Sequence, residues 1–311
     1  MNVAYQHIAK NADGPMKYGR LNMQSDREKV GNLFAEQYKK AYVQAIASPL
    51  AEKIHRAISL IQLWEGHALE LSPDGYYVAF SGGKDSTVLE KLFRMSGVRY
   101  KAYYNNVTID PPELVRHIKR FYPHVPWNNK ETSLPLRMKK ESQGPPTRLS
   151  RWCCEYYKEQ GGNGLFKALG VRGPESPRRI LQWQEVTQNR ATGDLILCPV
   201  AYWTDEDIWA FIRQYNLPYC ELYDQGYSRL GCIGCPMSGS KGQSRDFARW
   251  PRYEALWKRG FREYWDTWKG VPRLDGKPRW IEKMSGVEEL WQWWRSGKAL
   301  GKGHDCQIYQ W

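Results

Sequence analysis

The sequence lacks long apolar runs and has too few acidic residues to balance its basic ones. It contains no stretch of about 18 consecutive apolar residues, so we expect no membrane-spanning helix. Residues 1–10 include no apolar segment of the kind that a secretory signal needs, which predicts a cytoplasmic protein with mostly reduced thiols. Against 33 acidic residues stand 46 lysines and arginines, a formal charge of +13. This excess favours polyanionic partners such as nucleic acid or nucleotides.

The 311 residues divide into three expected segments. Residues 1–70 form a helical N-terminal segment, and residues 71–238 alternate predicted strands with helices. Such alternation is typical of an α/β fold with a doubly wound parallel sheet that carries helices on both faces. Residues 239–311 hold nine of the fifteen tryptophans, and fifteen Lys or Arg against nine Asp or Glu. This composition predicts a basic, mostly helical C-terminal subdomain.

Hydrophobic periodicity and turn residues place the individual elements. Ser48 followed by Pro49 is a typical helix start, and Gly97 is a typical helix stop. The predicted strands are residues 76–80, 98–104, 165–171 and 196–200. The predicted helices of the first two segments are residues 26–47, 50–64, 87–95, 113–121 and 208–215.

The most informative motif is the anion loop, which we define as Ser81–Thr87, with the sequence Ser-Gly-Gly-Lys-Asp-Ser-Thr. A strand that opens through glycines into a helix directs backbone N–H groups and the positive helix end at one point, which suits a phosphate or sulfate. Gly82 and Gly83 let the backbone approach an anion closely. The side chains that offer donors or charge are Ser81, Lys84, Ser86 and Thr87. The loop is not the common nucleotide motif G-x-x-x-x-G-K-[ST], because Asp85 stands where Ser or Thr is required.

Four of the seven cysteines form two pairs: the adjacent Cys153 and Cys154, and the C-x-x-C of Cys232 and Cys235. Four thiolates in a reducing compartment suit either a [4Fe–4S] cluster or a structural zinc ion. Zinc sites usually contain two C-x-x-C units, and adjacent cysteines fit a tetrahedral ion poorly, so we rank the cluster first and zinc second. Four ordinary buried thiols are an alternative. A C-x-x-C redox pair is another, but it leaves the adjacent cysteines unexplained.

Together, the anion loop and the cysteine pairs resemble the phosphoadenosine phosphosulfate reductase family of the adenine-nucleotide α-hydrolase superfamily. The resemblance is greatest to the cluster-bearing branch and runs from about Tyr76 to Met237. Besides the loop, it rests on Asp110–Glu113, Pro146–Arg148, Cys153–Cys154 with Lys158, Gly170–Ser176 with Arg178 and Arg179, Trp203–Asp207, and Tyr223–Asp224 followed by Arg229–Cys232. It implies a [4Fe–4S] cluster held by the four paired cysteines beside a nucleotide site.

The tail departs from the reductases of this family. Their C-terminal Glu-Cys-Gly-Ile/Leu-His segment carries the cysteine that attacks the sulfate sulfur. Here Cys306 lies in Gly303–Ile308, with neither the preceding Glu nor the following Gly-x-His. The chain is also similar to the cluster-bearing ATP pyrophosphatases of DNA phosphorothioation, which combine the complete loop and four cysteines with an added basic region.

This second similarity gives the leading hypothesis, an ATP pyrophosphatase that converts ATP to AMP and pyrophosphate. Adenylation of an oxygen, preferably in the DNA backbone, prepares it for replacement by sulfur. Mg²⁺ and Lys84 would neutralise the β- and γ-phosphates, while Asp85 would contact the metal indirectly or brace the loop. Charge at the transferring centre would be stabilised by Arg172, Arg178 and Arg229, as positioned cations do in phosphoryl transfer. Glu113 would orient the nucleotide.

The partners implied are DNA, a cysteine desulfurase or another sulfur donor, and further sulfur-modification subunits. One alternative is a thioredoxin-linked adenylylsulfate or phosphoadenylylsulfate reductase in which Cys306 attacks sulfur. Another is a non-catalytic DNA-binding subunit with a degenerate nucleotide site, which the intact loop argues against.

The tryptophans of the C-terminal segment predict a helix with one buried face. Trp250, Trp257, Trp265 and Trp268 follow one another at spacings of seven, eight and three. We expect this face to pack against the nucleotide domain. The basic residues expected to remain outside and meet phosphates are Arg252, Lys258, Arg259, Arg262 and Lys269.

Overall fold

The structure is a computed structural model that describes residues 41–189 and 193–298. Its contacts divide the chain into two compact units, Met1–Ala47 and Ser48–Trp311. The described part of the first unit, residues 41–47, is helical as expected, whereas residues 26–40 of the same predicted helix lie outside the described residues. The sheet, the anion loop and the paired cysteines all belong to the second unit.

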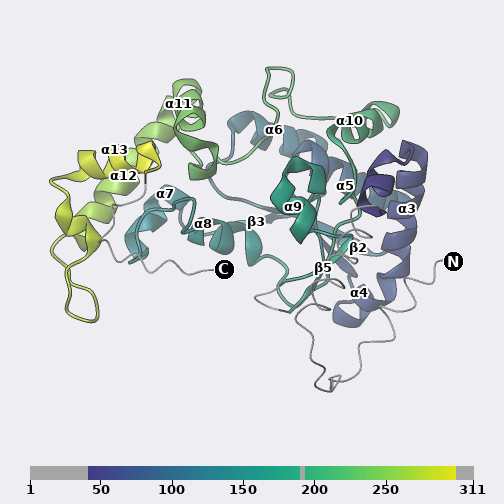
Figure 1. Ribbon diagram of the computed structural model, residues 1–311, viewed down its shortest axis with the longest axis horizontal. Coiled ribbons are helices and arrows are strands. Elements are labelled where there is room, and N and C mark those ends of the chain that lie inside the picture. Colours follow the sequence, from purple (N-terminus) through teal and green to yellow (C-terminus); the bar gives the residue numbers. More distant parts are fainter. Residues whose placement is uncertain (1–40, 190–192, 299–311) are drawn as a thin grey trace, which may run out of the picture. The chain divides into compact units, whose positions relative to one another are not determined.

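A six-stranded sheet with the order β3-β2-β1-β4-β6-β5 forms the centre of this unit (Figure 1). The strands are β1 Tyr76–Phe80, β2 Tyr100–Asn105, β3 Trp127–Asn128, β4 Lys167–Ala168, β5 Val186–Gln188 and β6 Leu195–Leu197. All described pairings are parallel except that of β5 with β6. The predicted α/β class is therefore confirmed. The expected strands after residue 160 are shorter than predicted, and β3 and β5 were missed.

The central strand explains where a ligand can bind. β1 pairs on one side with β2, through Val78 and Ala102, and on the other with β4, through Val78 and Ala168. In chain order, β2 and β3 add to one side of β1, and the chain then crosses to the other side of β1, where β4 and β6 lie. In open α/β sheets, ligands bind beyond the carboxyl ends of the strands at such a switch point. The anion loop directly follows β1 and so lies at this place.

Helices cover the sheet. The described helices are α3 Leu50–Leu63, α4 Glu65–Leu71, α5 Lys84–Ser96, α6 Pro112–Phe121, α7 Leu134–Arg137, α8 Trp152–Cys154, α9 Pro177–Gln182, α10 Asp205–Gln214, α11 Gly239–Arg249, α12 Pro251–Trp268 and α13 Val287–Ser296. The ends of α3, α5, α6 and α10 lie within three residues of the predicted ones, whereas α7, α8 and α9 were not predicted. Single 3₁₀ turns are η1 Met138–Lys140, η3 Gly173–Glu175, η4 Pro236–Ser238 and η5 Trp280–Lys283, and η2 Glu155–Glu159 is a π-helical turn.

Local signals account for several of these ends. Gly97 adopts φ 72° and stops α5, as its position after the helix predicted. Thr204 caps α10, and Asp207 returns the bond to the Thr204 backbone in a capping box. The start of α3 is one residue later than expected, since Pro49 occupies the N-cap and Leu50 is the first helical residue.

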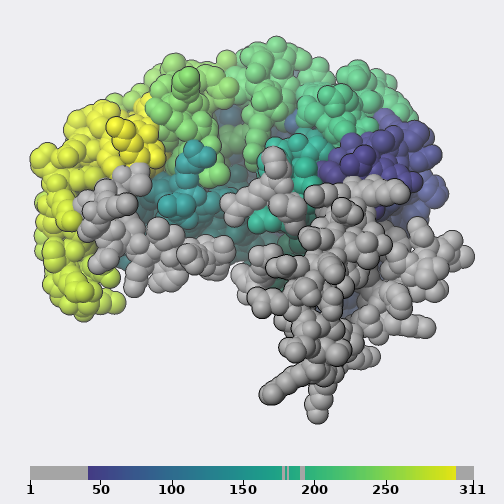
Figure 2. Space-filling view, in the orientation of Figure 1, coloured from purple at the N-terminus to yellow at the C-terminus, as the bar shows by residue number. Residues whose placement is uncertain are grey.

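The C-terminal helices belong to the same compact unit as the sheet and share its hydrophobic core. Helix α12 lies along α7 and η1, and α11 and α13 gather beside it (Figure 1). In the space-filling view, the green segment that joins α10 to α11 lies between these two helices along the upper edge (Figure 2). Trp257 is 1% exposed and its ring lies 4.8 Å from that of Trp294. The predicted tryptophan face is buried in part: Trp257 and the N-cap residue Trp250 are buried, whereas Trp265 and Trp268 are half-buried, and Phe261 and Tyr264 complete the buried face.

One expected surface cation is not on the surface. Lys269 is half-buried, and its ammonium donates to the carbonyls of Ile281, Glu282 and Met284, with distances of 3.4, 3.2 and 3.1 Å. It therefore anchors the chain between α12 and α13 and is not available to a phosphate. Among the residues from 41 to 189 and from 193 to 298, no helix is both long and apolar enough to cross a membrane.

Candidate functional site

The anion loop is held open by Gly82 and Gly83. Gly82 adopts φ +71°, and a Cβ at this position would lie 2.5 Å from Cγ1 of Ile118 in α6. Gly83 is the N-cap of α5 and has no side chain of its own to cap the helix, while the backbone N–H of Lys84, the first residue of α5, donates to the Tyr223 hydroxyl at 2.9 Å. The positive end of α5 faces the loop, which is an arrangement that suits an anion.

Two serines shape the turn. Ser86 Oγ donates to the carbonyl of Gly83 at 2.9 Å and accepts from the backbone N–H of Ser81 at 3.1 Å. The hydroxyls of Ser81 and Ser86 lie 3.1 Å apart. Thr87 is buried, 1% exposed, so its hydroxyl does not open toward the loop. Of the three predicted hydroxyl donors, the structure brings Ser81 and Ser86 together.

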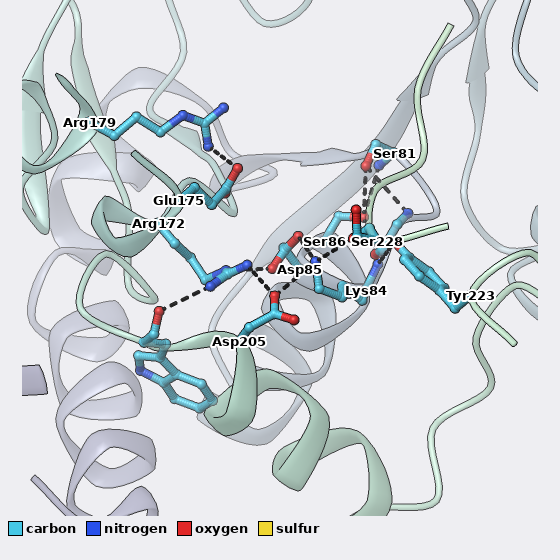
Figure 3. Close-up of polar contacts among 12 residues, drawn as sticks. Ser81, Lys84, Asp85, Ser86, Arg172, Glu175, Arg179, Asp205, Tyr223 and Ser228 are labelled. Atoms are coloured by element: carbon cyan, nitrogen blue, oxygen red, sulfur yellow. Dashed lines mark hydrogen bonds and ion pairs between the residues drawn. The ribbon is translucent and has the colours of Figure 1, made fainter. Parts of the chain in front are cut away.

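Lys84 and Arg172 meet two carboxylates behind the loop (Figure 3). The Lys84 ammonium lies 3.2 Å from Asp205 and 3.4 Å from Asp85, and donates to the carbonyl of Ser228 at 3.4 Å. Arg172 donates through Nε to Asp85 at 2.6 Å and through Nη2 to Asp205 at 2.8 Å. Of the two roles considered for Asp85, this geometry supports bracing of the loop.

Asp205 is a residue that sequence reasoning missed. It stands in the predicted helix start Trp203–Asp207, where an acidic residue is expected for local reasons alone. Its contacts with Lys84 and Arg172 join α10 to α5 and to the segment after β4, and no local pattern predicts them. Arg172 makes a third contact, a hydrogen bond from Nη1 to the carbonyl of Trp203 at 3.3 Å. This bond also links the guanidinium to the start of α10.

The other predicted charged residues are placed differently. Arg229 is exposed and follows Ser228, whose carbonyl accepts from Lys84. The side chain of Arg178, in α9, lies outside the described residues. Glu113 has both carboxylate oxygens occupied, by Arg249 at 3.1 Å and by the indole N–H of Trp250 at 3.2 Å. It ties α6 to the corner between α11 and α12, so its contacts give no support to the predicted role of orienting a nucleotide.

The two cysteine pairs lie close enough to influence each other electrostatically. The thiol of Cys153 donates to Cys154, and this bond, together with a 3.4 Å contact from Arg151, lowers the pKa of Cys154 to about 5. Burial raises the pKa of Cys232 to about 12, against the opposing charge of Lys158, and also raises the pKa of Cys235. The neighbouring thiols contribute to the shifts of Cys153, Cys232 and Cys235. The charges of Arg151 and Lys158 favour thiolates at this corner, and burial opposes them.

The chemistry of this donor set fits a thiolate-bound metal group. All four cysteines are free, and Lys158 and Arg151 supply positive charge that would offset thiolates. In the described part of the chain, however, no three His, Cys, Asp or Glu side chains converge closely enough to hold a single metal ion. Cys306 and the rest of Gly303–Ile308 lie outside the described residues.

A cleft of about 2320 Å³ reaches from Ser81, the first residue of the anion loop, to Arg151 and Lys158 beside the cysteines, which do not line it themselves. Ser81, at the start of the anion loop, lines it at the end of β1, and Lys158 and Asp110 line it near the cysteines. Its volume is larger than the roughly 300–1,000 Å³ of a typical small-molecule site.

A family model described as the phosphoadenosine phosphosulfate reductase domain matches residues 75–238, just over half of the chain. The chain belongs to this reductase-domain family. The match ends where the C-terminal helices begin, so the family accounts for the sheet, the anion loop and both cysteine pairs. The resemblance inferred from the motifs is confirmed at this level.

Relatives within the family carry the name adenosine 5'-phosphosulfate reductase. The protein of Staphylococcus epidermidis is 28% identical over 149 residues, which cover 44% of this chain and 59% of the relative. That of Shouchella clausii is 30% identical over 148 residues, with coverages of 44% and 60%. The chain thus spans about three-fifths of the length of these relatives.

Among solved structures, a phosphate complex of phosphoadenylyl-sulfate reductase from Candida auris is similar. It is 14% identical, with a TM-score of 0.44, and the alignment covers 69% of this chain and 98% of that one.

Proposed function

We propose that this member of the family is an ATP pyrophosphatase that activates an oxygen for replacement by sulfur. The observation that carries the proposal is the complete anion loop at the switch point of the sheet, with Lys84 at the start of α5. Hydroxyls, backbone N–H groups and a lysine at one helix start suit a phosphate group, and the triphosphate of ATP would present several of them.

In the proposed reaction, an acceptor oxygen attacks the α-phosphorus of ATP. The bond from this phosphorus to the bridging oxygen breaks, and pyrophosphate departs with the electron pair. The anion loop and Lys84 stabilise the charge that develops on the departing group. A sulfide-level sulfur then attacks the adenylated phosphorus of the acceptor, and AMP leaves with the former acceptor oxygen and the electron pair of the broken bond. Delivery of the sulfur from a protein persulfide would in addition need a thiol to reduce the S–S bond. Mg²⁺ would share the charge of the phosphates.

A [4Fe–4S] cluster at Cys153, Cys154, Cys232 and Cys235 belongs to this proposal. Such a group would supply an electron-transfer or sulfur-binding centre beside the cleft. Lys158 would offset negative charge at these sulfurs, and Arg151 contacts the sulfur of Cys154 at 3.4 Å. Protein purified without oxygen should contain about four irons per chain, and Cys232→Ser should lose them. Stoichiometric zinc without iron would instead identify a structural metal site.

Incubation of the protein with ATP and Mg²⁺ tests the reaction directly. We expect AMP and pyrophosphate in equal amounts, and Lys84→Ala should weaken ATP binding by roughly ten- to hundredfold through the loss of a charge-assisted contact. Lys101→Ala is the matched control, because this exposed lysine of β2 pairs with Asp74. Release of ADP and phosphate, or no cleavage in the presence of candidate acceptors, would contradict the proposal.

Sulfonucleotide reduction is the second candidate, because the named relatives are adenosine 5'-phosphosulfate reductases. In this reaction the anion loop would bind the nucleotide, Cys306 would attack the sulfur, and thioredoxin would release sulfite. Sulfite formation from adenylylsulfate with thioredoxin, without pyrophosphate formation from ATP, would favour it.

The proposed acceptor is the DNA backbone, and a cysteine desulfurase or another sulfur-donor protein would supply the sulfur. Further sulfur-modification subunits would complete the system. The formal charge of +13 supports an acidic polymer as partner. Exposed Arg252 and Arg262 on the outer face of α12 add to this support.

A further inference from the structure

Tyr223 reaches the anion loop from a distant part of the chain. Its hydroxyl accepts a hydrogen bond from the backbone N–H of Lys84 at 2.9 Å, across 139 residues of sequence. In the close-up, the loop residues lie between Tyr223 on one side and Arg172 on the other (Figure 3). Tyr223 thus contacts the first N–H group of α5, at the place where the loop would receive an anion.

Neighbouring side chains hold the ring in this position. Its edge packs against Trp209 of α10 with the ring centroids 5.2 Å apart, and the ammonium of Lys84 lies 5.8 Å from the ring centre. Burial is the main cause that raises the pKa of Tyr223, so the hydroxyl keeps its proton at neutral pH. It is a fixed, protonated group beside the loop.

The Tyr223 hydroxyl has an O–H group that is free to donate a hydrogen bond to a ligand. A tyrosine O–H can donate one hydrogen bond and accept others. Within the described part of the chain, Tyr223 accepts from Lys84 but donates to no protein group. A Cβ built on Gly83 would lie 3.4 Å from this hydroxyl and 3.4 Å from Ser81 Oγ, so the two hydroxyls lie around the same N-cap. A phosphate oxygen bound at the N-cap would therefore lie near both hydroxyls.

We propose that Tyr223 is a phosphate-binding residue whose hydroxyl donates to the pyrophosphate group of the nucleotide while it continues to accept from Lys84 N–H. The inference rests on the proposed function, since it assumes that the anion loop receives the terminal phosphates of ATP. It adds a ligand from outside the loop motif. The chain that carries Tyr223 continues to Ser228, which accepts from Lys84, and then to Cys232.

A purely structural role of Tyr223 predicts the opposite change in affinity for phosphate when the hydroxyl is removed. If Tyr223 only caps α5, removal of its hydroxyl frees the Lys84 N–H for the anion. Phosphate binding would then stay the same or become tighter, while the protein loses some stability. The direction of the change in affinity therefore separates the two roles.

The test is calorimetric titration of the full chain and of Tyr223→Phe with inorganic pyrophosphate, ATP and AMP. We expect Tyr223→Phe to bind pyrophosphate and ATP roughly ten- to hundredfold more weakly, the usual effect of losing a hydrogen bond to a charged group. AMP, which lacks the β- and γ-phosphates, should bind both proteins about equally. Tyr219→Phe is the matched control, because its hydroxyl contacts Asp224 at 3.1 Å and its ring also packs on Trp209.

Unchanged or tighter binding of pyrophosphate and ATP by Tyr223→Phe would overturn the inference. If Lys84→Ala weakens ATP binding while Tyr223→Phe does not, the inference alone fails and the proposed function stands. If the parent binds adenylylsulfate but forms no pyrophosphate from ATP, the proposed function fails. The same titration with adenylylsulfate then decides whether Tyr223 contacts the bound anion.

Discussion

Arg172 is 3% exposed, and its charge is matched by carboxylates on two other elements. Asp85 belongs to the start of α5 and Asp205 to the start of α10, so one guanidinium joins both helices to the end of the segment after β4. A planar guanidinium suits such a junction because its N–H groups point in several fixed directions.

Replacing Arg172 by methionine should lower the free energy of unfolding by about 1–3 kcal/mol, because Asp85 and Asp205 would lose the guanidinium between them and keep only the ammonium of Lys84. Urea denaturation measures this change. Asp205→Asn is the control: its side chain is 52% exposed, so the loss of its ion pairs should cost less than about 1 kcal/mol. Equal stability of Arg172→Met and the parent would mean that the junction does not brace the loop.

Gly82 and Gly83 are adjacent but differ in what they tolerate. At position 82, a Cβ would lie 2.5 Å from Cγ1 of Ile118, and the residue that carries it would have to adopt φ +71°. Gly82→Ala should therefore lower the free energy of unfolding by about 1–3 kcal/mol, through strain and overpacking. Gly83 has φ −79°, and its Cβ would be 3.4 Å from the nearest side chains, so Gly83→Ala should fold as the parent does. Thermal unfolding of both variants checks this contrast.

At the scale of single elements, α6 buries one face against the sheet and places His117 in it. His117 is 6% exposed, and its Nε2 has no hydrogen-bond partner within the described residues. Burial lowers the pKa of His117 from 6.5 to about 4. The folded state therefore favours neutral His117, whereas the unfolded chain takes up a proton below its ordinary pKa.

This shift predicts a loss of stability in acid. As the pH falls from about 6.5 to about 4, the unfolded state binds the proton first, and His117 should cost up to about 3 kcal/mol of unfolding free energy. His117→Phe removes the titrating group and should lose less stability than the parent between pH 7 and pH 4.5. Denaturation curves at several pH values measure the difference. Parallel pH profiles of the two proteins would show that His117 does not titrate as expected.

At the scale of the whole molecule, the excess charge predicts salt-sensitive binding to DNA. The structure gives several α12 cations partners: Lys258 pairs with Glu254 at 3.0 Å and Arg259 with Glu263 at 2.9 Å. Arg252 and Arg262 are exposed and make no ion pair in the part of the chain that the structure describes. They are the best-placed cations of this helix for phosphate contacts.

Reversing Arg252 and Arg262 to Glu should weaken DNA binding and flatten the plot of log affinity against log salt by roughly 0.9 per lost contact. Fluorescence anisotropy over a salt series measures the slope. The control is the double reversal of Arg116 on α6 and Arg213 on α10, which removes the same amount of charge from other exposed positions. Equal slopes for the two double variants would exclude α12 as the DNA contact.

The sequence by itself determined the α/β class, the anion loop and the two cysteine pairs. These features rest on local signals: glycines between a strand and a helix, caps such as Thr204, and cysteines close in sequence. The same signals placed α5, α6 and α10 almost at their observed ends. Strands β3 and β5 escaped because two or three residues are too few to show a period.

The tertiary structure decided which side chains meet at the site. Asp205 and Tyr223 reach Lys84 from more than a hundred residues away, and Glu113 meets Arg249 and Trp250. Each of these residues has an ordinary local setting, so its sequence neighbours carry no sign of its partner. Such contacts depend on how helices dock on the sheet, because buried charges and donors take the partners that packing brings within hydrogen-bond distance.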